Sequence, residues 1–490
     1  MNLAMVLEMA ASGFGDRVAV GPLDGGLTFA QVATRAGALA DDLRSARPGP
    51  VAVAAPTGPH TPVALFGAAA AGRSYAPLNY RLPGPALDEL IRRLDPALLI
   101  TDPALPNHEP APERRSKLPL SGAGSLGAEV AFSYDEAPEA PAVVLYTSGT
   151  SAAPKAAVLR HDQLAAYLFA TLEFGSAEPD EVNLLAAPPF HVAGVAGLLS
   201  AVYTGRRVAA LPRFTAEAWV EGAWRERATH VFLVPTMLAR IVAVLDADPS
   251  LAAPPLRHLA YGGARMPLPV LERALELFPD TNFVNAYGLT ESSSTVSILG
   301  PADHRRGDRK LLTSAGRPLP GVEVQVIDEL GAPVAAGEPG EICLRGDQVS
   351  GAYLEAGSKL DADGWLHTGD RGSVDAEGYL YVTGRADDMI ISGGENIAPA
   401  EVEDALLRHP DVTAAAVVGL GDDEWGERVA AMVVPRAGSA LAEGDLAAWA
   451  RERLGGLKAP ATLVFRDELP TGATGKVLKR EVRAELEAPG

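Results

Sequence analysis

Short apolar runs recur along the chain up to about residue 290, and alanine-rich stretches with helical spacing separate them. Their residues are 51–55, 98–101, 143–146, 183–187, 207–211, 230–234, 258–261 and 282–286. Strands that are buried on both faces read as continuous apolar runs, and helices between them indicate crossover connections. The pattern therefore predicts layered α/β subdomains with largely parallel strands.

The pattern changes past about residue 312, where strand-like runs alternate with Gly/Asp turns at 322–328, 340–345 and 379–383. This favours a small, β-barrel-like sheet region. Beyond residue 385 the chain predicts a compact α+β unit, with helices at 399–409 and 443–454 and strands at 414–419 and 429–434. We expect an N-terminal domain over 1–384 and a C-terminal domain over 385–490, with their boundary at 384–388. Residues 104–118 predict a surface loop, and 62–71 a core helix.

Composition narrows the function classes. A chain of 490 residues is expected to hold two or more domains. Its net charge of −20 argues against binding to nucleic acid or to an anionic membrane. Cys343 is the only cysteine, which excludes an intramolecular disulfide and fits a reducing cytoplasm. We see neither a signal peptide nor a membrane-spanning run.

Residues 143–155 combine an apolar strand with a turn rich in hydroxyl groups and glycine. The turn runs through Thr147, Ser148, Gly149, Thr150 and Ser151, and a cation, Lys155, follows it. Backbone N–H groups, hydroxyls and a lysine together suit phosphate oxygens. The Walker ending is missing, and a plain Ser/Thr turn is the structural alternative.

Four further motifs carry polar groups suited to chemistry. Residues 285–291, Asn-Ala-Tyr-Gly-Leu-Thr-Glu, follow a predicted strand, and 367–370, His-Thr-Gly-Asp, are expected in a turn. The segment 384–397 crowds charges and paired glycines at the domain boundary. Residues 469–476 place Lys476 on a loop near the C-terminus, where a surface lysine is ordinarily only a solvated charge.

In this order, these motifs resemble the adenylate-forming superfamily over nearly the whole chain. The block 384–403 is most similar to bacterial aryl-CoA ligases such as 4-chlorobenzoate-CoA and o-succinylbenzoate-CoA ligases. The resemblance implies that a carboxylate attacks the α-phosphorus of ATP, which gives an acyl-adenylate and pyrophosphate. A thiol then displaces AMP, and a mobile C-terminal lid turns about a hinge at Asp387 between the two steps.

The same resemblance implies roles for individual residues. Lys476 would stabilise the α-phosphate during adenylation, Glu291 would hold Mg²⁺, and His191 would lie beside the acyl pocket. The implied catalytic set is Lys476, His191, Thr290 and Glu291. The implied ATP-binding set is Thr147, Ser148, Gly149, Thr150, Ser151, Lys155, Gly262, Gly263, Ala264, Tyr287, Gly288, Thr290, Asp370, Arg385 and Lys476. The implied acyl pocket comprises His191, Ala193, Gly197, Gly262, Gly288, Ser292 and Ser293, and CoA would contact Arg81, Gly393, Gly394, Trp425 and Lys458.

Two departures from the family pattern concern the phosphate loop and the acceptor site. Ala152 and Ala156 stand where glycines are usual, and alanine disfavours positive φ. The segment 456–460 lacks an aromatic residue and a second arginine that some CoA ligases have. No aspartate occurs from 190 to 197, which disfavours an amino-acid substrate.

The sequence therefore predicts an AMP-forming acyl- or aryl-CoA ligase that uses ATP, Mg²⁺ and CoA with a small-molecule carboxylic acid, favouring an apolar or aromatic one. One alternative passes the acyl group to a carrier-protein phosphopantetheine, or to another nucleophile, including nitrite with an aryl amine. A second is a non-catalytic nucleotide-binding protein on the same scaffold. A homodimer remains open.

Overall fold

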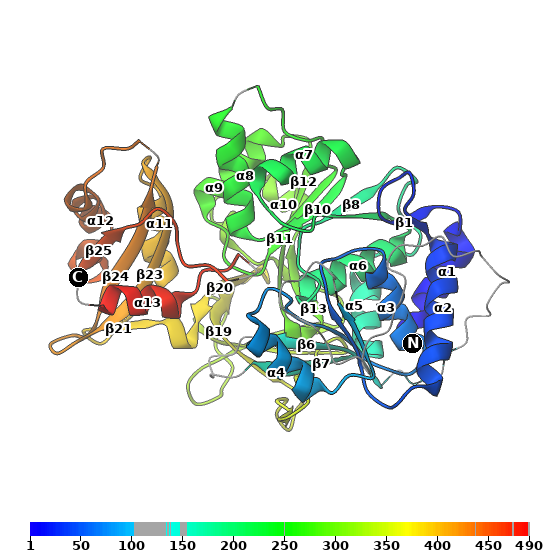
Figure 1. Cartoon of the computed structure of the whole chain (residues 1–490). Coiled ribbons are helices and arrows are strands. Elements are labelled where there is room, and N and C mark those ends of the chain that lie inside the picture. Colours follow the sequence, from blue (N-terminus) through cyan, green and yellow to red (C-terminus); the bar gives the residue numbers. More distant parts are fainter. Residues whose placement is uncertain are drawn as a thin grey trace.

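The computed structural model describes residues 1–101, 134, 137, 139–147, 154–248, 250–436, 438–472 and 475–488 (Figure 1). The side chain of Asn396 is not described either. The predicted surface loop 104–118 lies outside these residues, as do five positions of the phosphate loop: Ser148, Gly149, Thr150, Ser151 and Ala152.

Within the described residues, the body contains a mixed sheet of nine strands. Their order is β14 (Arg317–Pro318), β13 (Ser294–Leu299), β12 (Asn282–Leu289), β11 (His258–Gly262), β10 (His230–Leu233), β8 (Val182–Leu185), β9 (Arg207–Ala210), β1 (Val18–Val20) and β2 (Leu27–Thr28). The strands from β12 to β1 run parallel, and the pairs at both edges are antiparallel. The predicted apolar runs 183–187, 207–211, 230–234, 258–261 and 282–286 are confirmed as strands.

A second sheet has seven strands in the same described part of the body. Their order is β18 (Gly357–Ser358), β17 (Ala352–Tyr353), β7 (Lys155–Arg160), β6 (Pro141–Thr147), β4 (Tyr75–Pro77), β3 (Val51–Ala54) and β5 (Leu98–Thr101). Its strands from β6 to β5 are parallel, as the apolar runs predicted. The antiparallel β6–β7 pair carries the phosphate-loop sequence across its turn.

Helices cover both large sheets (Figure 1). They are α1 (Leu3–Phe14), α2 (Phe29–Ser45), α3 (His60–Ala70), α4 (Gly84–Leu94), α5 (His161–Thr171), α6 (Val192–Thr204), α7 (Ala216–Glu226), α8 (Pro235–Ala247), α9 (Leu268–Leu277) and α10 (Pro301–His304). Nearly every residue of α3 is buried, which confirms the predicted core helix. No helix in the described ranges is long and apolar enough to cross a membrane.

The predicted small sheet region is an antiparallel sheet in the described residues, formed by β15 (Val322–Ile327), β16 (Gly340–Gly346), β19 (Leu366–Val374) and β20 (Leu380–Arg385). The turn predicted at 367–370 was wrong, because these residues lie within β19. Gly369 has φ +71° there, and the pairing with β16 shifts register nearby. Glycine in such a conformation marks a bulge in a strand rather than a turn.

The residues after β20, here called the lid, have their own sheet and their own core, and they lie to the left of the body in Figure 1. Its strands are β21 (Ile390–Ser392), β22 (Glu395–Ile397), β23 (Val412–Asp422), β24 (Gly426–Pro435) and β25 (Thr462–Phe465), and its helices are α11 (Pro399–Leu407), α12 (Glu443–Lys458) and α13 (Lys479–Glu487). A short, exposed 3₁₀ turn, Ala386–Asp388, joins β20 to β21. The predicted hinge, Asp387, lies in this turn.

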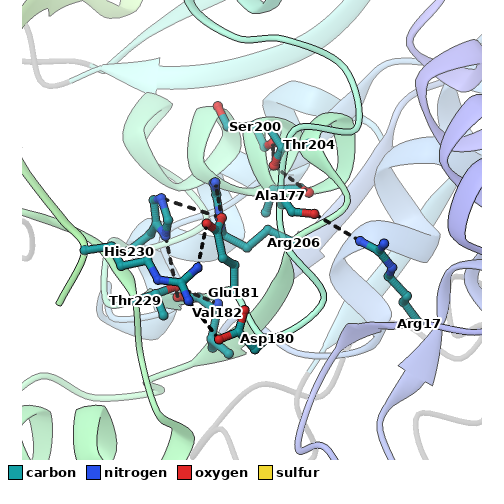
Figure 2. A network of polar contacts seen from close by, with 12 residues as sticks. Arg17, Ala177, Asp180, Glu181, Val182, Ser200, Thr204, Arg206, Thr229 and His230 are labelled. Carbon is teal, nitrogen blue, oxygen red and sulfur yellow. Dashed lines mark hydrogen bonds and ion pairs between the residues drawn. The ribbon is translucent and has the colours of Figure 1, made fainter. Parts of the chain in front are cut away.

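The amino ends of the parallel strands carry a polar network (Figure 2). Glu181, just before β8, accepts hydrogen bonds from Arg206 Nε at 3.0 Å and Nη2 at 2.8 Å, and from Arg257 Nη1 at 3.0 Å. His230 Nε2 lies 3.8 Å from the same carboxylate. The Glu181 and Arg206 side chains are each only 12% exposed. These contacts join the starts of four strands, opposite the edge where ligands bind in such sheets.

Replacing Glu181 by Gln is expected to lower the free energy of unfolding of the body by about 2 kcal/mol, because the variant leaves the Arg206 guanidinium without its carboxylate. Chemical denaturation, followed by tryptophan fluorescence, measures the loss. Glu178→Gln is the matched control, since Glu178 is exposed on the same loop. Equal stability losses in the two variants would contradict a stabilising role for the network.

Candidate active site

The candidate active site lies at the carboxyl edge of the nine-stranded sheet. Strand β11 ends there at Gly262, and β12 continues past it to Leu289. The loop after β8 leads to His191, which precedes α6, and β10 leads to Thr236 in the first turn of α8. In parallel sheets with helical crossovers, this edge is where ligands bind.

The motif at 285–291, expected to follow a strand, instead belongs to that strand for most of its length. Strand β12 runs to Leu289, and only Thr290–Ser292 form a 3₁₀ turn. The antiparallel neighbour β13 pairs with the motif and extends the strand. Every residue from Val284 to Thr290 is half-buried, so the strand does not show the usual alternation of buried and exposed side chains.

Two predicted ligand-site glycines are required by the sheet itself. A Cβ at Gly262 would overlap the carbonyl oxygen of Ala286, and one at Gly288 would overlap that of Ser294. Neither position could therefore hold a side chain, whatever ligand the site takes. Gly263 is different, because it is exposed with φ +80° and faces the Lys476 side chain.

Tyr287, Asp370 and Arg385 form one polar cluster. The Tyr287 hydroxyl donates to Asp370 Oδ2 at 2.8 Å, and Arg385 Nη1 donates to Asp370 Oδ1 at 2.8 Å and to the Thr368 carbonyl at 2.9 Å. Burial and the Asp370 charge raise the pKa of Tyr287 well above its usual value, so its hydroxyl stays protonated. A carboxylate has about four lone-pair sites, so Asp370 can still accept hydroxyls from a ligand.

Lys476 is the lid residue that reaches this cluster. Its Cε lies 3.5 Å from where a Cβ on Gly263 would stand, and Thr236 Oγ1 donates to the Gly475 carbonyl at 2.6 Å. Desolvation lowers the pKa of Lys476, and the charges of Asp370 and Glu291 oppose that shift. The structure thus brings one cation from the lid beside two carboxylates of the body.

His191 lies at the N-terminal end of α6, and its ring is 6.0 Å from that of Phe190. Desolvation, and secondarily the Lys476 charge, lower the pKa of His191 to about 4. Its imidazole is therefore neutral near pH 7, where it can donate or accept a hydrogen bond without adding charge.

Glu291 offers a carboxylate suited to a magnesium ion. The Tyr353 hydroxyl donates to its Oε1, and Oε2 has no hydrogen-bond donor among the described residues. Magnesium in nucleotide sites is commonly held by one or two carboxylates together with the substrate's phosphates. One carboxylate oxygen without a hydrogen-bond donor among the described residues fits that donor set. No cluster of three or more metal-binding side chains occurs in the described ranges.

Both ends of the phosphate loop are anchored in the β6–β7 pair. Thr147 lies opposite Lys155 in register, and its Oγ1 donates to the Lys155 carbonyl at 3.4 Å. Ala156, expected at a loop glycine position, is a buried residue of β7 without positive φ. Alanine therefore fits there without strain. Arg93 Nη1, at the end of α4, donates to the Pro154 carbonyl at 3.1 Å.

The predicted acyl-pocket residues divide into two groups. Ala193 and Gly197 are half-buried on α6, and a Cβ at Gly197 would meet Leu185 Cδ1 at 3.0 Å. The Ser292 hydroxyl donates to the Leu289 and Ser294 carbonyls, so the turn itself uses it. Ser293 is fully buried at φ +56°, and its hydroxyl has no partner within the described part of the chain.

The residues predicted at CoA are not gathered in one place. Gly393 and Trp425 contact each other in the lid, where a Cβ at Gly393 would meet Trp425 Cε3 at 2.8 Å, and Gly394 follows with φ +81°. Lys458 Nζ instead donates to Glu401 Oε1 at 2.8 Å, within the lid. Arg81 belongs to the body, with its guanidinium 5.5 Å from the Tyr80 ring centroid.

Several functional contacts were missed in the sequence because they join distant segments. The Tyr353–Glu291 bond joins β17 to the 3₁₀ turn after β12, and the Thr236–Gly475 bond joins the body to the lid. Arg265 of the body forms an ion pair with Asp404 of the lid at 2.7 Å. No motif marks these residues; only the fold places them together.

Sequence comparison adds family information to this geometry. A sequence model described as AMP-binding enzyme matches residues 7–354, and one described as AMP-binding enzyme C-terminal domain matches 401–476. The chain belongs to the AMP-binding enzyme family. The first match lies in the body and includes His191 and Glu291, and the second lies in the lid and ends at Lys476.

The names of similar proteins imply different acceptors for the acyl group: CoA, an acyl carrier protein or an amine. The chain is 38% identical to a feruloyl-CoA synthase of Amycolatopsis sp., over 93% of each chain. It is 33% identical to the fatty acid–[acyl-carrier-protein] ligase ScoC of Streptomyces coeruleorubidus, covering 93% of this chain and 92% of that one. Its fold matches the amide bond synthetase McbA from Marinactinospora thermotolerans with a TM-score of 0.82, at 30% identity and over 99% of each chain.

Proposed function

We propose that this protein is an AMP-forming acyl- or aryl-CoA ligase that uses ATP, Mg²⁺ and CoA. The main support for this proposal is that Lys476 of the lid interacts electrostatically with Asp370, Arg385 and Glu291 of the body. A cation so placed is suited to charge that develops on a phosphate during adenylation. Its relatedness to CoA ligases supports the acid-thiol reaction.

In the first half-reaction, a substrate carboxylate oxygen forms a bond to the α-phosphorus of ATP while the bond to the leaving pyrophosphate breaks. Lys476 would stabilise the negative charge on the pentacoordinate phosphorus. Asp370, held by Tyr287 and Arg385, would accept the ribose hydroxyls. His191 is neutral, so it would orient the acid by hydrogen bonding and not by attracting the carboxylate with a positive charge. A magnesium ion held at Glu291 would supply charge neutralisation for the phosphates.

In the second half-reaction, the thiol sulfur of CoA attacks the acyl carbonyl, and AMP leaves with the electron pair of the broken bond. The thiol proton goes to solvent or base. We propose that the lid turns about Asp387, in the exposed link Ala386–Asp388, between the two half-reactions. The body–lid contacts at Thr236 and Arg265 would then break, so the present arrangement corresponds to adenylation. The domain limits 1–384 and 385–490 remain part of this proposal.

We propose an apolar or aromatic monocarboxylic acid as the substrate. The half-buried residues of α6 near His191 include two small ones, Ala193 and Gly197. Feruloyl-CoA synthase and the indoleacetate–CoA ligase of Aromatoleum aromaticum, 34% identical over 93% of this chain, act on aromatic acids by their names. A cytoplasmic site of action accords with one buried cysteine, whose thiol pKa burial raises to about 12.

A carrier-protein phosphopantetheine, or an amine, is the second candidate acceptor. The observation that favours it is Lys458, which pairs with Glu401 instead of remaining available to CoA. The names of ScoC and McbA point the same way. A homodimer stays a prediction.

Acid-dependent ATP–pyrophosphate exchange, with a panel of aromatic, fatty and dicarboxylic acids, tests the proposed function. We expect exchange with at least one aromatic or apolar acid. Adding CoA, carrier protein or an amine to the same reaction then identifies the acceptor from AMP release. Absence of exchange across the whole panel would refute the enzyme assignment and leave the non-catalytic alternative.

A further inference from the structure

Strand β19 carries a bulge opposite β16, and Asp370 lies within it. Glu341 pairs with Arg371, and the next regular pair is Cys343 with His367. The step from 341 to 343 on β16 thus faces the step from 367 to 371 on β19, which leaves β19 with two extra residues over this stretch. Extra residues of a bulge lose their hydrogen-bonding partners on the adjacent strand. The backbone that presents the Asp370 carboxylate therefore depends on other contacts.

Side chains replace the missing strand-to-strand bonds in this bulge. Glu341 Oε1 accepts a hydrogen bond from the Gly369 N–H at 3.2 Å. Thr368 Oγ1 accepts from the Asp370 N–H at 3.0 Å and donates to the Ile342 carbonyl at 2.6 Å. Gly369 has φ +71°, a conformation that only glycine adopts without cost. Because a backbone N–H that leaves the ladder needs another acceptor, the Glu341 bond stabilises this conformation.

The bulge sets the direction of the Asp370 carboxylate. The Asp370 side chain is only 9% exposed, and it accepts hydrogen bonds from Tyr287 and Arg385 at 2.8 Å each. Arg385 Nη1 also donates to the Thr368 carbonyl, which belongs to the bulge, at 2.9 Å. The carboxylate and the guanidinium that holds it are thus both tied to the bulged backbone. Glu341 acts on this arrangement through the backbone, at the residue immediately before Asp370.

The Glu341 side chain is itself held in place from a second side. Its Oε2 lies 3.4 Å from His367 Nδ1, and His367 Nε2 lies 3.5 Å from Asp361 Oδ2. One carboxylate oxygen of Glu341 therefore serves the Gly369 N–H, and the other faces the imidazole. Side chains that bind a ligand keep their geometry best when the residues supporting them are fixed by further polar contacts. His367, the first residue of the motif at 367–370, supports the site in this way without contacting a ligand.

We propose that Glu341 is a positioning residue for the nucleotide: it holds the Gly369 backbone so that the Asp370 carboxylate faces the ribose hydroxyls. This rests on the proposed function, in which Asp370 accepts those hydroxyls from ATP. Loss of Glu341 should therefore weaken recognition of the ribose and leave the groups that act on the phosphates, Lys476 and Glu291, in place. A glutamine at 341 can accept the same N–H through its amide oxygen, whereas an alanine cannot.

Calorimetric titration of the full chain with ATP and with 2′-deoxy-ATP, in the presence of Mg²⁺, tests the proposal. Glu341→Ala should raise the Kd for ATP roughly 10-fold and the Kd for 2′-deoxy-ATP by a smaller factor, because 2′-deoxy-ATP has one ribose hydroxyl fewer to lose. Glu341→Gln should stay within about two-fold of the wild-type protein, since it keeps the acceptor. Glu323→Ala is the matched control, because Glu323 is an exposed carboxylate of the same sheet, on β15, and pairs with Arg345.

Two further measurements separate positioning from a general loss of structure. In pyrophosphate-exchange kinetics, Glu341→Ala should raise the KM for ATP while kcat falls less than about three-fold, the pattern of lost nucleotide binding. Gly369→Ala disturbs the same bulge from the other strand, because alanine disfavours φ +71°. It should lower the preference for ATP over 2′-deoxy-ATP in the same way.

Two results would overturn the proposal: the full wild-type preference for ATP over 2′-deoxy-ATP in Glu341→Ala, or an equal loss of that preference in Glu341→Ala and Glu341→Gln. The first would show that the position of Asp370 does not depend on Glu341. The second would show that the charge of Glu341 matters and its bond to Gly369 does not. Failure of the proposed function gives a different pattern, because the wild-type protein would then show no acid-dependent exchange, whatever its calorimetric preference for ATP.

Discussion

Lys476→Ala is expected to lower acid-dependent ATP–pyrophosphate exchange by roughly 100- to 1000-fold, the usual cost of removing one group that stabilises transition-state charge. The lysine is the cation that the lid brings beside Asp370 and Glu291. Without the lysine, no ammonium group from the lid stabilises the negative charge that develops on the α-phosphate. The same variant should convert a supplied acyl-adenylate to thioester at close to the wild-type rate, because the second step breaks the acyl C–O bond and leaves intact the O–P bond that Lys476 helped to form.

The control for this experiment is Lys479→Ala. Lys479 is three residues further along, on α13, and pairs with Glu403 at 3.2 Å within the lid. Its loss removes the same charge from the same region but not from the site. Equal effects of the two variants on exchange, or equal loss of both half-reactions in Lys476→Ala, would contradict the role given to Lys476.

Asp370→Ala is expected to reduce kcat/KM for ATP in the exchange reaction by about 100-fold. The buried carboxylate accepts from Tyr287 and Arg385, and its removal would both free the Arg385 guanidinium and remove the acceptor for the ribose. The wild-type protein should prefer ATP over 2′-deoxy-ATP. The variant should lose most of that preference, since the acceptor that distinguishes the two nucleotides is gone.

Asp347→Ala serves as the matched control, because Asp347 is exposed directly after β16 of the same small sheet. A general effect on folding would lower the rates with both nucleotides equally. If Asp370→Ala kept the full preference for ATP over 2′-deoxy-ATP, Asp370 would not contact the ribose.

The parallel strands were predictable because burial on both faces leaves a nearly unbroken apolar run, as in 207–211 and 258–261. The same reasoning failed at Asp370 and at Tyr287. Gly369 was expected in a turn and Gly288 beyond the end of a strand, but each lies within a strand. Local composition carries no information about a bulge, or about a neighbouring strand whose backbone approaches closely enough to demand glycine.

The candidate site was predictable where its residues form short motifs, and unpredictable where they come from separate loops. Asp370, Arg385 and Lys476 could be named from their motifs, and the structure brings their side chains together. Arg213 and Arg240, which line a cavity between the body and the lid, belong to no motif, and only the fold brings the loop between β9 and α7 to the same cavity as helix α8. The pairing of Lys458 with Glu401 depends on how α12 packs beside α11.

The central claim is that the acid is activated as an adenylate, and an isotope experiment tests it most directly. A substrate acid carrying ¹⁸O in its carboxylate is converted to thioester with ATP and CoA, and the products are analysed by mass spectrometry. Attack on the α-phosphorus predicts AMP that carries one labelled oxygen, because that oxygen stays on phosphorus when the thiol displaces AMP. Unlabelled AMP, with the label in inorganic phosphate or left entirely in the acyl group, would contradict the account.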